Sequence, residues 1–306
     1  MSGRPPVSVI VPFAGSRDQL DRLLSALERL ALGDQDEILV AVNRAAAGTG
    51  SRPGRIQLVS ASGLHSPGFA RNQAAAVARG EWLVFIDADT RPSESLLADL
   101  FSPAPAGDTA VLAGEIRDVA GAGWVVARHA VARRQMSQAN TLSRGEFAYA
   151  QTANCAIRAA AFVEVGGFTS GARTAEDADL CFRLTAAGWR IELRSGAIVS
   201  HISRGTMAAR LGQLARHGAG AEWLNRRYPG ALPAPSPVAL LRRLAASTRE
   251  LARGLARRDR EAAAFAVLDL LGAVAFEFGR MLPNRVRRER GFAGPFPGEP
   301  QRERMD

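Results

Sequence analysis

Short apolar runs alternate with amphipathic segments along the first two thirds of the chain. The runs Val7–Pro12, Glu37–Val42 and Trp82–Ile86 are rich in β-branched and aromatic residues, which predicts buried strands. Leucines at helical spacing follow the capping-box sequence Ser16–Gln19, and Ala70–Ala78 predicts a second helix. Because strands alternate with helices, the pattern predicts an α/β fold with a mostly parallel sheet flanked by helices.

The pattern is less regular beyond residue 100. Val111–Ile116 predicts a strand, and a mostly helical segment follows it to about Tyr149. A further helix is expected from Thr174 onward, and Ile191–Val199 fits a last strand.

After residue 205 the chain becomes helical. Met207–Arg227, Val238–Arg258 and Glu261–Met281 predict three helices, and the four prolines of Pro229–Pro237 predict a linker. Beyond residue 283 the chain is polar and contains Pro, Gly and Arg, which predicts disorder. We therefore expect an α/β domain over 1–205, a helical extension over 206–283 and a disordered tail over 284–306.

The basic charge of the chain does not by itself identify a partner. The formal net charge is +9, and all 39 basic residues are arginine because the sequence contains no lysine. Together with the abundance of alanine, this usage indicates a genomic composition bias. No recognised nucleic-acid-binding motif accompanies the charge, so we expect no nucleic-acid partner.

Composition also bears on the compartment. The two cysteines have no metal-ligand spacing and suggest no disulfide framework, which favours a reducing cytosol. Met1–Pro6 lacks the layout of a secretory signal, and Asp269 and Glu277 interrupt the apolar stretch Ala262–Phe278. We expect a cytoplasmic protein, with peripheral contact at the inner face of the membrane left open.

Two carboxylates, Asp87 and Asp89, directly follow the buried run Trp82–Ile86. In an extended chain, residues two apart face the same way, and the carboxyl end of a parallel strand faces the crevice where α/β sheets bind ligands. Unpaired carboxylates are costly to bury, so a divalent cation such as Mg²⁺ or Mn²⁺ would resolve the conflict and bridge diphosphate oxygens. A solvated strand end followed by a turn is the alternative.

A second acidic pair, Glu176 and Asp177, lies at the start of the helix expected from Thr174. A carboxylate there can act as the base that takes a proton from an attacking hydroxyl. Alternatively, residues 174–177 form a capping box in which Asp177 only bonds the helix backbone. A helix N-terminus favours the ionised carboxylate, so the base role requires burial or negative neighbours to raise its pKa.

Two basic side chains are further candidates. His201 follows the last predicted strand and, as a neutral imidazole, can complete a metal site, although a lone histidine is more often an ordinary polar residue. Arg71 follows Pro67 and Gly68 near a predicted helix start, where it and backbone amides can hold phosphate or ribose. A surface arginine in the first turn of a helix is the alternative for Arg71.

Taken in order, four segments resemble the family 2 glycosyltransferases. VSVIVPF is similar to the family's first strand, GFARNQAAAVARGEWLVFIDADT to its central motif, TANCAIRAAAFVEVGGF to its acceptor-side stretch and TAEDADLCFRLTAAGWRI to its catalytic helix. The match spans residues 7–201. The resemblance implies a GT-A-type, Rossmann-like domain, a nucleotide-sugar donor, a divalent cation (Mg²⁺ or Mn²⁺) and inversion by direct displacement.

The resemblance also implies roles for individual residues. The base would be Asp177, and the metal ligands would be Asp87, Asp89 and His201. The residues at the nucleotide-sugar pocket would be Pro12, Phe13, Asn43, Arg71 and Asp87. The residues toward the acceptor would be Asn154, Gly167 and Glu176.

Departures from the family pattern bear on the substrate. Where the family usually has acidic residues after its second strand, this chain has Asn43 and Arg44; the asparagine can still bond a base edge, but donor identity is left open. No QxxRW-type motif follows His201, which favours one transfer per binding event. The loop PFAGSRDQL lacks the glycine-rich basic sequence of a sugar nucleotidyltransferase. We therefore expect a non-processive glycosyltransferase, with a catalytically silent nucleotide-sugar-binding protein as the alternative.

The segment Val238–Arg258 reads as a basic amphipathic helix, with leucines near one face and arginines around them. Such a helix can lie on an anionic membrane, or it can pack against the catalytic domain or a second subunit. The acceptor is a carbohydrate, a lipid-linked molecule or a small molecule. A lipid-linked acceptor would make peripheral attachment sensible.

Overall fold

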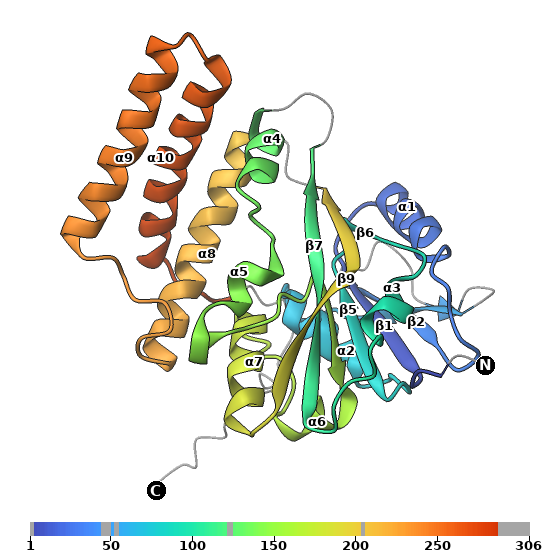
Figure 1. Cartoon of the computed structure of the whole chain (residues 1–306). Helices are drawn as coiled ribbons and strands as arrows, with labels where there is room; N and C mark the ends of the chain where they lie inside the picture. The colour runs from blue at the N-terminus through green and yellow to red at the C-terminus, as the bar shows by residue number, and fades with distance from the viewer. Residues whose placement is uncertain (1–2, 44–49, 52–54, 121–124, 203–205, 287–306) are drawn as a thin grey trace, which may run out of the picture. The chain divides into compact units, whose positions relative to one another are not determined.

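A computed structural model of the chain describes residues 3–43, 50–51, 55–120, 125–202 and 206–286. Their contacts define two compact units (Figure 1). The first comprises Met1–Ile116, Ser137–Val199 and Arg285–Asp306, and the second comprises Arg117–Met136 and Ser200–Asn284. Residues 117–136 thus group with the C-terminal helices, which no feature of the sequence suggested. Of the tail expected over 284–306, residues 287–306 lie outside the described part.

A mixed sheet forms the centre of the first unit. In the described part of the chain, its nine strands have the order β3-β4-β2-β1-β5-β8-β7-β9-β6. The strands are β1 (Val7–Phe13), β2 (Glu37–Val42), β3 (Gly50–Ser51), β4 (Ile56–Ser60), β5 (Trp82–Ile86), β6 (Thr90–Pro92), β7 (Thr109–Val119), β8 (Asn154–Arg158) and β9 (Arg190–Ile202). Strands β4, β2, β1 and β5 are parallel, whereas β8 pairs antiparallel with both β5 and β7.

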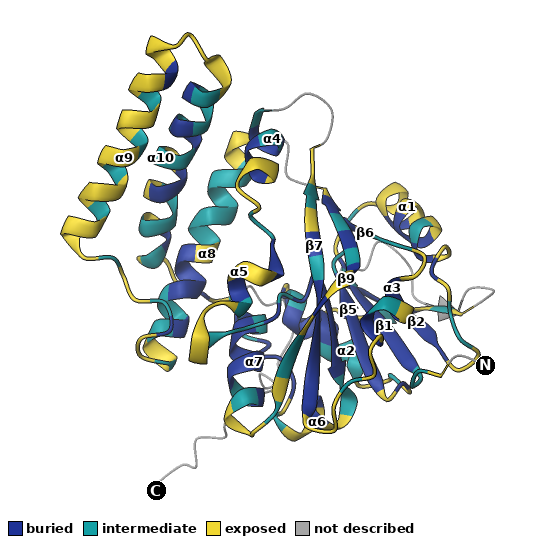
Figure 2. Ribbon diagram, viewed as in Figure 1, coloured by how far each residue is buried: buried dark blue, intermediate teal, exposed yellow. Residues whose placement is uncertain are grey.

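Helices pack on both faces of this sheet. The helices of the first unit are α1 (Arg17–Leu27), α2 (Pro67–Ala75), α3 (Leu96–Leu100), α5 (Gln138–Leu142), α6 (Ala159–Glu164) and α7 (Glu176–Ala186), with a 3₁₀ turn at Gly145–Phe147. Helices α2, α6 and α7 share one buried core with alternate sheet residues such as Ile10 and Phe85. Trp82 points to the other face, where its ring meets Phe101 at the end of α3. Figure 2 shows β1, β2 and β5 almost entirely buried.

The predicted α/β class is confirmed, and several elements have the bounds that the pattern gave. Strands occupy Glu37–Val42 and Trp82–Ile86, and a complete capping box between Ser16 and Gln19 starts α1. Strand β8 was not predicted. It lies between β5 and β7 and pairs antiparallel with both, so the parallel run β4-β2-β1-β5 ends at β5.

The second unit is helical. It contains α4 (Val125–Ala132), α8 (Met207–Arg227), α9 (Pro237–Ala256) and α10 (Arg260–Arg280). Helix α10 contacts α8, α9 and α4. It is also the one helix among the described residues that is long and apolar enough to cross a membrane by length and composition. Three of its acidic side chains are paired inside this unit; the pairs are Glu261–Arg128, Asp269–His129 and Glu277–Arg280.

Candidate functional site

The start of α2 is fixed by its cap. Ser66 Oγ accepts the Phe69 N–H at 3.2 Å and donates to the carbonyl of Ala172 at 3.2 Å. A Cβ at Gly68 would lie 3.1 Å from Cγ of Glu176, so the glycine allows α7 to begin close beside α2.

Arg71, one turn into α2, forms the centre of a buried charge cluster. Its side chain is 3% exposed; Nη2 donates to Asp87 Oδ1 at 2.6 Å and Nη1 to Glu176 Oε1 at 2.8 Å. Burial by itself lowers the pKa of Arg71, but Asp87 and Glu176 raise it, and the net result is a pKa above the ordinary value. The surface-arginine alternative is therefore wrong. Arg71 joins the carboxyl end of β5 to the start of α7.

Asp177 begins α7 beside this cluster. The helix starts after Ala175, which has a left-handed φ of 67°, and no side chain caps it, so the capping box expected over 174–177 is not formed. The Asp177 carboxylate still accepts the Ala178 N–H at 2.8 Å. Burial, together with the negative charge of Glu176, raises the pKa of Asp177 to about 7, against the lowering effects of the Ala178 N–H and Arg71. The condition for a base is therefore met.

Asp87 and Asp89 lie on a turn. Strand β5 ends at Ile86, and the Asp87 carbonyl accepts the Thr90 N–H at 3.1 Å and its hydroxyl at 2.7 Å. The prediction that Asp87 and Asp89 lie in an extended segment and face the same way is therefore wrong. The Asp87 side chain is 32% exposed and Asp89 is exposed. Within the described residues, no group of three or more His, Cys, Asp or Glu side chains is arranged to hold a metal ion.

His201, on β9, belongs to the second unit. Its Nδ1 lies 2.9 Å from Asp118 Oδ1, and the other oxygen of Asp118 accepts the Met136 N–H at 3.2 Å. The imidazole is therefore held in a fixed orientation by a buried carboxylate. This is the contact that usually orients a metal-ligating histidine, although it also occurs in purely structural histidines.

Three predicted nucleotide-pocket residues lie at the carboxyl ends of neighbouring parallel strands. Pro12 is half-buried and Phe13 is buried at the end of β1, and Asn43 follows β2. The Asn43 amide donates to the carbonyls of Leu64 and Ser66 at 3.0 and 3.2 Å, so it supports the loop before α2. Arg44 lies outside the described residues. Because β1, β2 and β5 are parallel, these residues share one sheet edge with Asp87.

The residues predicted toward the acceptor have structural contacts of their own. Asn154 is fully buried in β8, where its amide donates to the carbonyls of Glu115 and Ala197 at 3.0 and 2.9 Å. Its side chain therefore ties three strands together. Gly167 has φ of +69°, and a Cβ there would lie 2.8 Å from Asn72 Oδ1, so this turn requires a glycine.

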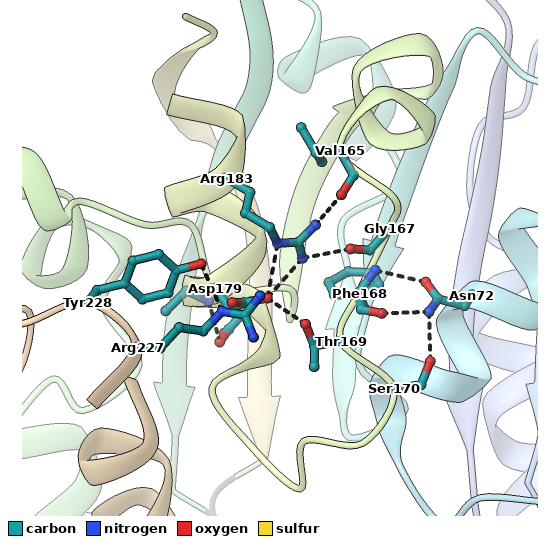
Figure 3. A network of polar contacts seen from close by, with 12 residues as sticks. Asn72, Val165, Gly167, Phe168, Thr169, Ser170, Asp179, Arg183, Arg227 and Tyr228 are labelled. Atoms are coloured by element: carbon teal, nitrogen blue, oxygen red, sulfur yellow. Dashed lines mark hydrogen bonds and ion pairs between the residues drawn. The ribbon is translucent and has the colours of Figure 1, made fainter. Parts of the chain in front are cut away.

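A polar network holds the loop that contains Gly167 (Figure 3). Asn72 accepts the Phe168 N–H and donates to the Phe168 carbonyl and to Ser170 Oγ at 3.0, 2.8 and 2.9 Å. Arg183 donates to the Gly167 carbonyl at 2.7 Å and pairs with buried Asp179 at 2.9 Å. The Asp179–Arg183 pair is visible in the sequence as an i,i+4 spacing. Nothing local to Asn72 in the sequence pointed to the role of its side chain.

The parallel strands β4, β2, β1 and β5, with a carboxylate turn at their carboxyl edge and the antiparallel strand β8 beside them, define the fold as that of a GT-A glycosyltransferase. A model of the family described as glycosyltransferase like family 2 matches residues 5–220, and the chain belongs to this family of transferase enzymes. The two cysteines, Cys155 and Cys181, are free and buried.

Similar proteins include the pre-mycofactocin glycosyltransferase of Mycobacterium tuberculosis, in strains CDC 1551 / Oshkosh and ATCC 25618 / H37Rv. Each is 26% identical over 237 residues, which cover 74% of this chain and 50% of the relative. The chain thus spans about half the length of the curated relatives it matches. A solved mannosyltransferase from Pyrobaculum calidifontis, in complex with GDP-Man and Mn²⁺, matches 92% of this chain and 88% of its own with a TM-score of 0.62 and 16% identity. This likeness shows the shared fold.

Proposed function

We propose that the protein is an inverting, metal-dependent, non-processive glycosyltransferase that moves a sugar from a nucleotide-diphosphate donor to an acceptor hydroxyl. The observation that carries the proposal is the cluster in which Asp87 and Glu176 hold the buried guanidinium of Arg71 while Asp177 stands beside them with a raised pKa. Family membership supports the transfer reaction. The GDP-Man of the solved neighbour supports the donor class.

Asp177 acts as the base in this proposal. The acceptor oxygen attacks the anomeric carbon and forms the new glycosidic bond, while the bond from that carbon to the diphosphate breaks and its electron pair leaves with the diphosphate. The hydroxyl proton passes to Asp177. A carboxylate with a pKa of about 7 is a stronger base than an ordinary one and is still largely ionised slightly above neutral pH.

Asp87 and Asp89 are the proposed cation ligands on this chain. Mg²⁺ and Mn²⁺ prefer oxygen ligands, and Mg²⁺ commonly takes only one or two protein carboxylates and completes its coordination with substrate phosphates and water. Two accessible carboxylates at the sheet edge fit that requirement. When bound, the cation offsets the negative charge that develops on the leaving diphosphate. His201, oriented by Asp118, stays a predicted further ligand.

Arg71 positions Asp87 in this scheme, and Phe13 and Pro12 provide apolar surface at the same sheet edge. The cytoplasmic location and the absence of a nucleic-acid partner stay predictions.

The test is Asp177→Asn. This change removes the proton acceptor but keeps the size of the side chain, so we expect sugar transfer to fall by at least about 100-fold while donor affinity stays within a few-fold of the wild-type value. Transfer is measured with a panel of nucleotide-sugars and Mn²⁺, and donor affinity by calorimetry. The exposed carboxylate variant Asp108→Asn is the matched control. Retained transfer in Asp177→Asn would refute the base assignment.

A further inference from the structure

The surface formed by α9 and α10 is unusually apolar on one side. The two helices pack along their length and run antiparallel, since Gly254 near the end of α9 meets Ala263 near the start of α10. The α9 positions that face α10 are those shielded from solvent, namely Leu240, Leu244, Ser247, Leu251 and Gly254. They recur every three or four residues, as one face of a helix does.

Helix α10 carries a stripe of exposed apolar side chains. Its members are Leu271, Val274, Phe278 and Met281, spaced three, four and three residues apart, with Phe278 53% and Met281 74% exposed. The spacing puts all four on one side of the helix. The three acidic residues of α10 that pair within the unit lie outside the stripe, so it is uncharged. In the second unit this stripe has no covering element among the described residues.

Helix α9 extends the same apolar side. Two of its exposed apolar residues, Leu241 and Leu255, each come one residue after a position that faces α10. On α10, Leu271 and Phe278 come one residue after positions 270 and 277, which follow Ala263 at seven-residue spacing and so lie on the side of α10 that meets α9. One residue is a rotation of about 100°. In two antiparallel right-handed helices, equal rotations turn both sets toward the same side of the pair. The two exposed sets therefore form one surface, the α9–α10 apolar face.

Arginines border this face on the outer side of α9. Arg242, Arg249 and Arg253 are exposed and lie roughly 80–160° around α9 from the exposed leucines, on the side of the helix turned away from α10. Glu250, the acidic residue of α9, lies 3.6 Å from Arg133 of the same unit. Because its negative charge interacts with Arg133, it does not fully neutralise the positive charge of these three arginines. An uncharged apolar strip thus runs alongside a row of cations.

We propose that the α9–α10 apolar face lies on an anionic lipid bilayer. Apolar side chains enter the boundary between headgroups and acyl chains, while the bordering arginines bind lipid phosphates. A second copy of the chain fits less well, because the acidic residues of α9 and α10 already pair within the unit and would offer no free negative charge to the bordering arginines of the other copy. Helix α10 lies on the membrane and does not span it, because Gly218 of α8 and Gly279 of α10 each meet backbone of the other helix closely. The inference does not depend on the proposed transfer reaction.

The test is sedimentation of the full chain with vesicles of phosphatidylcholine, with or without phosphatidylglycerol, at low and high salt. We expect binding that requires phosphatidylglycerol and weakens with salt. The double variant Phe278→Glu/Met281→Glu and the triple variant Arg242→Gln/Arg249→Gln/Arg253→Gln should each bind at least about tenfold more weakly. Two controls alter matched exposed positions of the first unit and should bind as the wild type does; they are Val163→Glu on α6 and Arg22→Gln on α1.

Either of two results would overturn the proposal. One is wild-type binding that is absent or equal on both kinds of vesicle. The other is a lipid-independent dimer in analytical ultracentrifugation that Phe278→Glu/Met281→Glu converts to monomer while vesicle binding is unchanged, which would assign the face to a second copy. Circular dichroism of each variant separates lost binding from lost folding.

Discussion

At the residue scale, the adjacent carboxylates Glu176 and Asp177 meet different surroundings although they begin the same helix. Glu176 is buried and accepts a hydrogen bond from the guanidinium of Arg71. Burial raises the pKa of Asp177, and the negative charge of Glu176 beside it raises the pKa further. The two neighbouring acids therefore suit the different roles of the proposed function, in which Glu176 holds Arg71 and Asp177 takes the proton.

The raised pKa of Asp177 predicts that the free energy of unfolding of Asp177→Asn depends on pH differently from that of the wild type. The pKa of Asp177 is about 7 in the folded chain, against an ordinary value of 3.8. Between these values the folded state keeps a proton that the unfolded state has released, so the free energy of unfolding of the wild type falls as pH rises from about 4 to about 7. Asparagine has no charge to bury. We therefore expect Asp177→Asn to be more stable than the wild type near pH 8, by on the order of 2–4 kcal/mol, with no difference near pH 4.

Urea unfolding of both proteins at the two pH values measures this difference. Asp108→Asn, which alters an exposed carboxylate, should show no pH-dependent gain. An equal gain at both pH values would mean that the asparagine packs better and that ionisation of Asp177 is not the cause.

The sequence alone predicted Asp87, Asp177 and Arg71 as candidate site residues, because each lies at the end of a predicted strand or near the start of a predicted helix. The sequence did not show that Arg71 pairs with Asp87 and Glu176. Arg71 and Glu176 are separated by 105 positions, and only the close packing at Gly68 brings them into contact. His201 and Asp118 lie 83 positions apart, so their contact could not be predicted from the sequence either.

At the element scale, local patterns located most helices and strands, while strand order depended on distant partners. Strand β8 is a short run of five residues, and its neighbour β5 lies about 70 residues earlier in the chain. The hydrophobic periodicity of a short segment cannot indicate its pairing with a strand so distant in the sequence. The turn at Asp87–Thr90 was predicted only as the alternative to an extended segment, since the apolar run ends at Ile86 without a glycine or proline to mark the bend.

Close backbone packing in the helical unit gives a test at this scale. A methyl group at Gly218 of α8 would lie 1.9 Å from the Phe276 carbonyl of α10, whereas one at Gly212 of the same helix would meet nothing closer than 3.7 Å. We expect Gly218→Ala to lower the free energy of unfolding by about 1–3 kcal/mol or more through forced separation of the helices. Gly212→Ala should raise it by up to about 1 kcal/mol, because alanine favours helix.

Thermal unfolding of the two glycine variants is the measurement, and each serves as the other's control. Equal effects of the two substitutions would show that α8 and α10 do not approach each other as closely as the structure has them.

At the scale of the whole molecule, the sheet edge of the first unit should link donor and cation binding to the stability of the fold. A ligand that binds only the folded state raises the free energy of unfolding by about 2.7 kcal/mol at a concentration a hundredfold above its Kd. We expect the matching nucleotide-sugar and Mn²⁺ together to raise the melting temperature more than the sum of their separate effects, because the diphosphate supplies cation ligands that the protein lacks. Asp89→Asn should remove this excess, and Asp108→Asn should retain it. If Asp89→Asn keeps the full excess, the cation is held elsewhere; if no donor stabilises the wild type with Mn²⁺, the edge formed by β1, β2 and β5 is not a nucleotide-sugar site.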